Sequence, residues 1–494
     1  MATMRITSLM ILLVLVIVTD DCHSISPWTP LTFTLTPSMG PSPGPSPSLT
    51  PAPAPSPSAP SQGIKAAYWP SFTGYPASFI DTSYFSHIYF AFILPSPSTY
   101  ELNVTSFHQE KIPEFMDALH SRNPPVKTIL SIGGAGNDPS VFSQIVSNEL
   151  TRAIFINSTI GVAREYGFDG VDLDWEFPIN ELDMLNLGLL FMQWRQILEC
   201  ESKVTNRSRL LLTSAVYYAS IVFLYAPPPS YPGDIIGNYV DWISPMCFDY
   251  CASSNPFTGE HAALYDPKSN ISTSFGIQSW IQANVPPEKI VMGMPLYGKT
   301  WTLQDPNVNG VGAPAVGAGP GNGILVYSQI VEFNSENNAT VVFDEQFVAS
   351  YSYAGDSWIG YDDVRSIKMK AEFAQSRSLG GYFFWALGQD KDWTISRAGK
   401  MVVMTGIYGA EDVREREGKI IERQICRKWV LEKKKKLVLA TGDGGIEVVD
   451  SADCRDLAGI HGEIAEEGVG HYLVLLGEVK QVVNGRRRSR KLFA

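Results

Sequence analysis

Short apolar runs recur along the middle of the chain, and longer segments capable of forming helices separate them. Eight runs lie between Gly63 and about Arg397: IKAAYW (64–69), HIYFAF (87–92), VKTILSIGG (126–134), GFDGVDLDWEF (167–177), LLLTSAVYY (210–218), VDWISPMCF (240–248), KIVMGMPLYG (289–298) and GGYFFWALG (380–388). Buried parallel strands are nearly continuous apolar runs of this kind. Their alternation with helical segments indicates right-handed βαβ units. Eight such units predict an α/β fold, a (β/α)8 TIM barrel over residues 63–400.

The widest gap between two of these runs spans residues 299–379. It contains the Gly/Pro-rich stretch GVGAPAVGAGPGNG, followed by the strand-like segments TVVFDEQ and ASYSYA. We therefore expect a small α+β insertion at about 300–357, between strands seven and eight. A doubly wound open sheet is the alternative that the pattern alone leaves open.

The ends of the chain differ from this middle part. The apolar run from Ile6 to Val18 has the length of a signal peptide and is too short to cross a bilayer, which takes roughly 20 apolar residues. We expect a signal peptide over 1–25 and a secreted protein, extracellular or in the cell wall, with no membrane span in the mature chain; an uncleaved anchor is the alternative.

Residues 26–62 alternate Pro with Ser, Thr and Ala, which predicts a disordered, extended linker or, alternatively, a glycosylated wall-anchoring stalk. Residues 401–494 form a C-terminal extension to which the pattern assigns no fold.

Charge and cysteine content narrow the function classes. The formal net charge of −12 argues against nucleic acid as the main partner, and basic runs occur only at 433–436 and 486–491. Cys247 and Cys251 could pair, or remain buried thiols. We expect a monomer and no cofactor or metal. Five Asn-x-Ser/Thr glycosylation acceptors fit a secreted protein, namely Asn103, Asn157, Asn206, Asn270 and Asn338.

The densest chemical signal is DGVDLDWEFP, residues 169–178. Side chains of a strand alternate between its faces, so Asp172, Asp174 and Glu176 share one face, which would point into the barrel. The apolar residues between them would meet the surrounding helices. Glu176 stands last, at the carboxyl end of the strand, where barrel enzymes place their chemistry. Asp169 has the opposite parity and is expected to orient the start of the strand.

Carboxylates at this spacing cannot all ionise at low cost, so at least one holds a proton and raises the pKa of its neighbour. A proton passed toward Glu176 would make that residue a general acid near neutral pH. A calcium loop needs a glycine inside the acidic repeat, which DLDWEF lacks. A solvated strand would not carry apolar residues throughout its other face. General acid chemistry is therefore the favoured interpretation over a metal site or an acidic surface strand.

The sequence resembles glycoside hydrolase family 18, the family of chitinases, and most closely its plant class V members. The family's strand-four signature, Asp-x-x-Asp-x-Asp-x-Glu, is matched in full from Asp169 to Glu176. Further matched segments are SIGG (131–134), GMPLYGKTW (293–301), WIGYDD (358–363) and GGYFFWALGQD (380–390). The resemblance covers residues 63–397 and implies retaining hydrolysis of β-1,4-linked N-acetylglucosamine, in which the substrate's own acetamido oxygen attacks the anomeric carbon.

The resemblance also implies a role for individual residues. Glu176 would protonate the leaving oxygen and later activate water, Asp174 would orient the acetamido group, and Asp172 would share its proton. Trp385 would form the hydrophobic floor under the sugar, because the apolar face of a sugar stacks on an aromatic ring. The remaining residues expected at this subsite are Tyr68, Phe90, Met246, Phe248, Asp249 and Tyr297.

One position departs from the family pattern. Strand six usually carries Met-x-Tyr-Asp, whereas this chain has Met246-Cys-Phe248-Asp249. The missing hydroxyl at Phe248 would cost on the order of 10²–10³ in rate. Two hypotheses of different class therefore stand: a secreted chitinase acting on fungal wall chitin or chitooligosaccharides, as in plant defence, and a chitin-oligosaccharide-binding lectin or receptor-like module with weak or no catalysis. An inhibitor on the same barrel is disfavoured by the complete acidic motif.

Overall fold

The computed structural model describes residues 63–123, 125–404, 436–440, 446–450 and 472–475. The expected signal peptide (1–25) and linker (26–62) lie outside the described residues. The described residues form two compact units. The first runs to Val403 apart from 266–269, and it contains the barrel; the second contains three short strands near the C-terminus.

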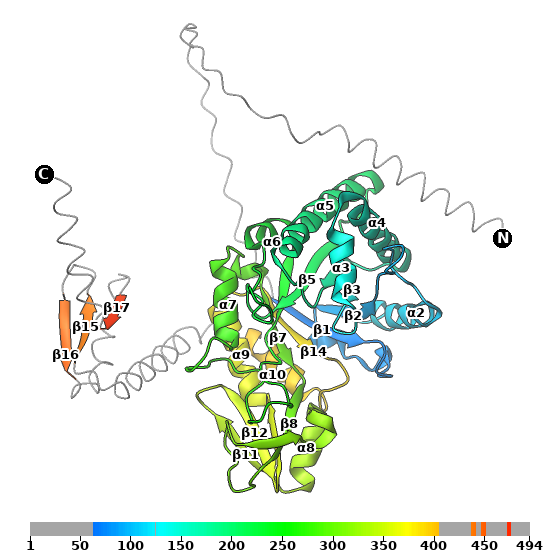
Figure 1. Ribbon diagram of the computed structural model, residues 1–494. Helices are drawn as coiled ribbons and strands as arrows, with labels where there is room; N and C mark the ends of the chain where they lie inside the picture. Colours follow the sequence, from blue (N-terminus) through cyan, green and yellow to red (C-terminus); the bar gives the residue numbers. More distant parts are fainter. Residues whose placement is uncertain (1–62, 124, 405–435, 441–445, 451–471, 476–494) are drawn as a thin grey trace, which may run out of the picture. The chain divides into compact units, whose positions relative to one another are not determined.

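Eight parallel strands form the centre of the first unit, and the predicted TIM barrel is confirmed (Figure 1). Their order is β6-β5-β4-β3-β2-β1-β14-β7, and a parallel bridge between Ile243 and Ile290 joins the two ends. The open-sheet alternative is therefore wrong. The strands are β1 (Ile64–Pro70), β2 (His87–Ile93), β3 (Lys127–Gly133), β4 (Gly170–Asp174), β5 (Leu211–Tyr217), β6 (Trp242–Met246), β7 (Val291–Pro295) and β14 (Gly381–Trp385).

Helices follow the strands and cover the outside of the barrel (Figure 1). Polar caps set where they begin: Asn148 accepts from the Thr151 amide at 3.0 Å, and Asn180 accepts from the Asp183 amide at 2.9 Å. Gly167 ends one of them in the left-handed conformation, at φ 82°. The helices are α2 (Ser106–His120), α3 (Pro139–Val146), α4 (Glu149–Tyr166), α5 (Glu181–Thr205), α6 (Gly233–Tyr239), α7 (Thr273–Gln282), α9 (Val364–Ser376) and α10 (Thr394–Met404).

The apolar residues divide between two sides of the strands, as strand parity requires. The larger cluster lies between strands and helices and includes Val171, Leu173 and Trp175, all at most 2% exposed. A smaller cluster fills the barrel interior around Tyr68 and Phe383. The acidic residues of β4 thus share the interior with aromatic rings, while the residues between them hold the helices.

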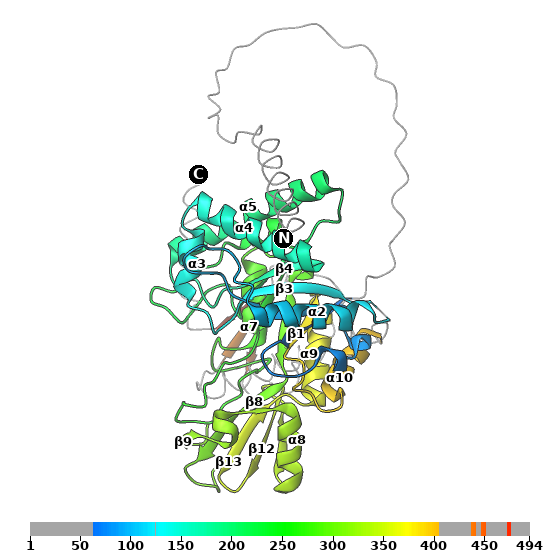
Figure 2. The same cartoon turned by 90° about the vertical axis from the view of Figure 1, so that its right-hand side faces the viewer.

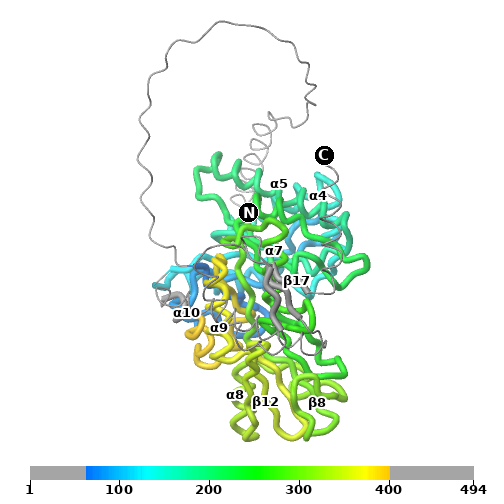
Figure 3. Tube along the Cα trace, turned by 90° about the vertical axis from the view of Figure 1, so that its left-hand side faces the viewer, coloured from blue at the N-terminus to red at the C-terminus, as the bar shows by residue number. Residues whose placement is uncertain are grey.

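A second sheet is inserted between β7 and β14. Five of its six strands are hydrogen-bonded in the order β10-β8-β13-β12-β11, and the sixth, β9, pairs with β8. Figures 1 and 2 show these strands and α8 gathered on one side of the barrel, away from α4 and α5, and Figure 3 shows the same grouping from the other side. The elements are β8 (Tyr297–Leu303), β9 (Ala315–Ala318), β10 (Ile324–Val326), α8 (Tyr327–Glu336), β11 (Thr340–Asp344), β12 (Ala349–Ala354) and β13 (Ser357–Tyr361).

The insertion therefore has the α+β character expected of it, and its sheet extends a few residues beyond the predicted 300–357 at each end. Its first strand follows the barrel without a loop, because only Leu296 separates β7 from β8. The Leu296 amide donates to the Trp385 carbonyl at 2.8 Å, and its carbonyl accepts from the Tyr327 amide at 2.8 Å. Barrel and insertion are thus tied together at the carboxyl end of β7.

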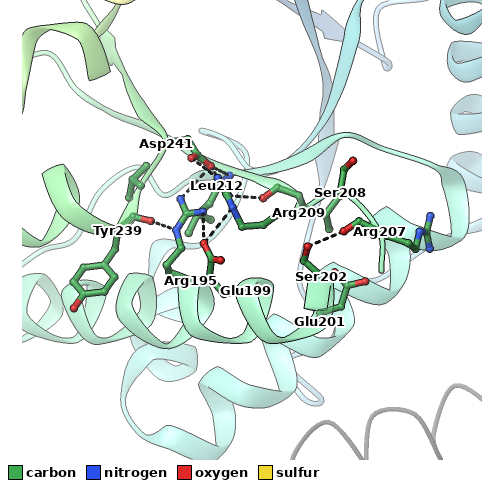
Figure 4. A network of polar contacts seen from close by, with 12 residues as sticks. Arg195, Glu199, Glu201, Ser202, Arg207, Ser208, Arg209, Leu212, Tyr239 and Asp241 are labelled. Carbon is green, nitrogen blue, oxygen red and sulfur yellow. Dashed lines mark hydrogen bonds and ion pairs between the residues drawn. The ribbon is translucent and has the colours of Figure 1, made fainter. Parts of the chain in front are cut away.

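Ion pairs hold the opposite, amino-terminal end of β5 and β6 (Figure 4). Asp241 accepts from both terminal nitrogens of Arg209 at 2.9 Å and from the Leu212 amide at 2.8 Å. Arg195 of α5 reaches the same carboxylate at 3.0 Å and donates to the Tyr239 carbonyl at 2.7 Å. A single carboxylate therefore fixes α5 and the segment after α6 to the starts of two strands.

The second unit has an antiparallel sheet of three strands. Its middle strand is β15 (Lys436–Ala440), which pairs with β16 (Ile446–Asp450) on one side and with β17 (Tyr472–Leu475) on the other. These strands fall within the extension 401–494, for which the sequence predicted no fold.

In the first unit, Cys247 is a buried free thiol, so the alternative of a disulfide to Cys251 is wrong. No helix among the described residues combines the length and apolar character that crossing a membrane takes.

Candidate active site

Asp172 is the most deeply buried carboxylate of the acidic face and lies inside a ring of hydroxyl donors. Its Oδ2 accepts from Tyr68 at 3.0 Å and Ser131 at 2.8 Å, and its Oδ1 accepts from Thr213 at 2.6 Å. Strand register produces this arrangement, because Ser131 and Thr213 are the direct neighbours of Asp172 on β3 and β5. Burial raises the pKa of Asp172, and the three hydroxyls oppose that shift.

Asp174 lies two residues after Asp172 on the same face of β4 and is 4% exposed. Its Oδ1 has no hydrogen-bond partner among the described residues. Burial, followed by the charges of Glu176 and Asp172, raises its pKa well above the ordinary value. A carboxyl group in this position holds a proton readily and presents an oxygen that no protein group occupies.

Glu176 follows the end of β4 and is partly exposed. Burial raises its pKa to about 7, with a further contribution from the charge of Asp249 and an opposing backbone hydrogen bond at Ala135. A carboxylic acid with this pKa is partly protonated at neutral pH and can donate a proton there.

The SIGG segment supports the backbone beneath these carboxylates. Gly133 has φ 113°, and a Cβ there would lie 2.1 Å from the Asp174 carbonyl oxygen. The amide of Gly134 donates to that same carbonyl at 2.8 Å. Only glycine permits this close approach. Asp169 orients the start of the strand as expected, because its carboxylate accepts from the Thr128 amide at 2.9 Å.

An aromatic wall lies beside the carboxylates in the barrel interior. The Trp385 ring is stacked on Phe92, with centroids 5.6 Å apart and planes at 19°, and it lies 5.5 Å from the Tyr68 ring. Phe248 meets Tyr297 and Phe383 edge-on, each at 6.2 Å. Met246 packs against the same interior cluster. The structure thus brings together Tyr68, Met246, Phe248, Tyr297 and Trp385.

Phe90 is the exception among the predicted residues. It is fully buried and packs against Trp69, Phe115 and Phe168 on the helix side of β2. The expectation that Phe90 lines the site is therefore wrong, because parity turns it outward. A register shift after Phe90 places Phe92 in the interior instead.

Asp249 lies beyond β6, half-exposed, with φ 60°. Its Oδ1 accepts from the Tyr297 hydroxyl at 2.8 Å, and Lys299 Nζ lies 2.8 Å from the same atom. His261 Nδ1 is 3.8 Å away. Burial would raise the pKa of Asp249, but His261 and Lys299 outweigh it and hold that pKa well below its usual range.

Sequence reasoning missed several of these groups. Thr213 is the direct neighbour of Asp172 on β5, so strand pairing could have indicated it. Phe92 and Lys299 stand inside quoted segments, but the register shift in β2 and the packing of the insertion bring them to the site, and strand parity predicts neither. His261 lies in a loop outside every recognised motif, and no sequence signal marks it. Tyr250 provides no hydroxyl in place of the one missing at Phe248, because it bonds Thr273 of α7 at 3.0 Å.

Known proteins are similar to this chain in sequence and in architecture. Residues 65–390 match the Glycosyl hydrolases family 18. A class V chitinase of Medicago truncatula is 54% identical over 340 residues, which cover 68% of this chain and 88% of the relative. The crystal structure of a class V chitinase mutant of tobacco in complex with NAG4 is 35% identical, with a TM-score of 0.67, and covers 69% of this chain and 99% of that one.

A chitinase-like agglutinin of Robinia pseudoacacia is also similar, at 36% identity and a TM-score of 0.64, over 69% of this chain and 99% of that one. Similarity at this level thus extends to proteins described as enzymes and to one described as an agglutinin. The family match, residues 65–390, falls on the barrel with its insertion, where the acidic motif lies. The chain belongs to glycosyl hydrolase family 18.

Proposed function

We propose that this protein hydrolyses β-1,4-N-acetylglucosamine linkages in chitin or chitooligosaccharides, with retention of configuration and with Glu176 as the general acid. The observation that carries the proposal is the position of Glu176 at the carboxyl end of β4, where burial raises its pKa to about 7. Glu176 protonates the glycosidic oxygen as the bond to the anomeric carbon breaks, and its carboxylate then accepts a proton from the incoming water.

The acetamido oxygen of the substrate acts as the nucleophile in this mechanism, so the chain needs no second carboxylate at attacking distance. Asp174 supports it, because its unpartnered Oδ1 can accept the acetamido N–H and stabilise the charge that develops there. Asp172, held by three hydroxyls, shares the proton that Asp174 takes up as Glu176 changes charge.

Trp385 and Phe92 provide an apolar surface for the sugar at the cleavage site. Both rings are partly exposed and stacked on each other, so one face of the pair is supported while the other can contact sugar. Tyr297 and Asp249 are bonded to each other beside Phe248 and would contact polar groups of the same sugar.

A chitin-oligosaccharide-binding lectin with weak or no catalysis is the second candidate. Phe248 favours it, because no hydroxyl stands there to hold the acetamido oxygen and Tyr250 is bonded elsewhere. The similarity to an agglutinin is consistent with this alternative. The complete acidic motif with its raised pKa values favours the enzyme, because binding alone requires no proton donor near neutral pH.

Hydrolysis of chitotetraose by the full chain distinguishes the two candidates. We expect shorter products, and loss of product formation in Glu176→Gln with the affinity for chitotetraose nearly unchanged. Binding without products in the unsubstituted chain would reject the enzyme. Phe248→Tyr tests the missing donor, and a rate increase of roughly 10²-fold is expected if its absence limits turnover.

We further propose that the protein is secreted and acts as a monomer outside the cell or in the wall. The apolar run at Ile6 to Val18 supports secretion. Detection of the chain in culture medium, and its elution volume on a sizing column, test these two statements.

A further inference from the structure

Lys370 is a buried lysine that joins α9 to the insertion and to the loop between β6 and α7. Its side chain is 2% exposed. Nζ donates to both carboxylate oxygens of Asp362, which directly follows β13, and to the main-chain carbonyl of Ala262 in the loop. A lysine ammonium is strongly hydrated in water, so its burial requires acceptors in place of that hydration. One of these acceptors belongs to the loop, and Lys370 therefore ties the loop to the helix.

The charges around Lys370 balance within one pair. The Asp362 side chain is fully buried, so its charge is compensated by Lys370 at close range. Glu260 lies in the same loop and is also buried. Burial, followed by the charges of Asp362 and Asp344, raises the pKa of Glu260 well above the ordinary value, which favours its neutral form. Removing the charges of Lys370 and Asp362 together therefore leaves no new uncompensated charge.

The loop residue next to Ala262 holds two segments of the active site. The carbonyl of His261 accepts from the Tyr250 amide at 2.9 Å. Its ring Nε2 donates to the Tyr297 carbonyl at 3.1 Å, because a carbonyl oxygen only accepts. Asp249 directly precedes Tyr250, and its carboxylate accepts from the Tyr297 hydroxyl at 2.8 Å. His261 thus fixes the backbone on both sides of the hydrogen bond between Asp249 and Tyr297.

The backbone of Asp249 depends on such support. Its φ is 60°, in the left-handed region that costs energy for a residue other than glycine. Its side chain is 52% exposed, so side-chain packing contributes little restraint. Before it, the Phe248 amide donates to the Met246 carbonyl at 2.8 Å, and after it the Tyr250 amide donates to the loop. A shift of the loop would therefore move Asp249.

We propose that Lys370 is a positioning residue of the active site, which holds the Ala262 carbonyl and so fixes the loop that orients Asp249 and Tyr297. The effect on catalysis rests on the proposed function, whereas the anchoring of the loop does not. Two measurements separate these parts.

The variants distinguish the anchor from the ion pair. Lys370→Met alone would leave the Asp362 carboxylate buried without a partner and destabilise the fold. Lys370→Met/Asp362→Asn removes both charges together with the contact to Ala262. Asp362→Asn alone removes the carboxylate but retains Lys370 and its donation to Ala262. Lys370→Met/Asp362→Leu is the second version of the double variant, for use if the first fails to fold.

Lys289→Met is the matched control. Lys289 also donates to main-chain carbonyls, those of Gly237 at 2.7 Å and Val240 at 2.9 Å. These contacts lie before the start of β7, at the amino-terminal end of the barrel and away from the carboxylates. Its loss should therefore leave the site unchanged.

The first measurement is hydrogen–deuterium exchange in the full chain, read by mass spectrometry on peptides that contain Tyr250. Loosening of the loop exposes the Tyr250 amide, so we expect exchange there to become roughly tenfold faster in the double variant. Exchange should be unchanged in Asp362→Asn and Lys289→Met. Unchanged exchange in the double variant would overturn the proposal, and this readout does not depend on activity.

The second measurement is kcat/KM for chitotetraose. We expect a fall of roughly tenfold in the double variant, because small displacements of positioning groups reduce the rate strongly, and near-normal values in Asp362→Asn and Lys289→Met. An equal fall in Asp362→Asn would assign the effect to loss of the ion pair and refute the anchor. In a Tyr297→Phe background, which lacks the hydroxyl that bonds Asp249, the double substitution should cost less than about twofold; a full tenfold loss there would refute the route through Tyr297. Absence of turnover in the unsubstituted chain would instead reject the proposed function, and the exchange at Tyr250 would then decide the anchor.

Discussion

Replacing Asp241 with asparagine should destabilise the barrel without altering the chemistry at its other end. The side chain is 20% exposed and accepts three hydrogen bonds, two from Arg209 and one from the Leu212 amide, in addition to the ion pair with Arg195 (Figure 4). Asparagine removes the charge and turns an N–H group toward these donors. Both arginines lose the anion that they share.

The size of the effect follows from these contacts. Breaking a buried ion pair by removing one partner costs about 3–5 kcal/mol. Arg195 and Arg209 are 13% and 27% exposed and so recover some hydration, which places the expected loss near 3 kcal/mol. For a domain of this size, such a loss lowers the melting temperature by about 6 °C. Urea denaturation at pH 7 measures the free energy of unfolding directly.

The pH dependence gives an independent check. Burial would raise the pKa of Asp241, but the hydrogen bonds from Arg209 and the charge of Arg195 outweigh burial and lower it. An acid with a lowered folded-state pKa stabilises the fold above its unfolded pKa of about 4, and this stabilisation is lost as pH falls through the folded-state pKa. The difference between the unsubstituted protein and Asp241→Asn should therefore be full at pH 7 and shrink below pH 4.

Glu199→Gln is the matched control for this prediction. Glu199 contacts Arg209 at 3.3 Å and Arg195 at 4.0 Å, but its side chain is 49% exposed. Its loss should cost less than about 1 kcal/mol. The reasoning fails if Asp241→Asn costs no more than Glu199→Gln, or if the difference between Asp241→Asn and the unsubstituted protein is independent of pH.

Three further predictions concern the site and the surface. The kcat/KM for chitotetraose should fall as pH rises through about 7, because Glu176 must be protonated to act as an acid; a plateau to pH 9 would contradict this. Phe92→Ala should weaken chitotetraose binding by about tenfold in calorimetry, whereas Phe90→Ala should leave binding unchanged and destabilise the fold by about 3–5 kcal/mol; equal effects on binding would refute the assignment of faces. In a secreting eukaryotic host, mass spectrometry should find glycan at Asn338, exposed after α8, and none at Asn157, half-buried inside α4, and the reverse occupancy would contradict this prediction.

Strand periodicity predicted the barrel because buried parallel strands leave a continuous apolar signal. The same two-residue period placed Asp172 and Asp174 on the interior face, where the structure has them. The period did not predict Phe92, because the register of β2 against β3 shifts after Phe90. A local irregularity of this kind leaves no signal in the composition. The face on which a later side chain lies therefore cannot be predicted by counting residues from the start of the strand.

The surroundings of Asp249 were beyond sequence reasoning for a different reason. Lys299 is fifty positions further along the chain, on the first strand of the insertion, and His261 is in a loop. Their approach depends on how the insertion packs on the barrel, which no local pattern encodes. The raised pKa of Glu176 was expected from neighbouring carboxylates on its own strand, whereas burial and Asp249 are its causes in the structure.

The direct passage from β7 into β8 has a consequence for protein engineering. Because only Leu296 separates the two strands, Tyr297 and Lys299 belong to the insertion while their side chains contact Asp249 of the barrel. A chimaera that receives a foreign insertion to change its substrate range would exchange these two contacts as well. The acidity of the proton donor would then change with the graft, because Asp249 acts on the pKa of Glu176. A graft intended to leave that pKa unchanged should retain Tyr297 and Lys299.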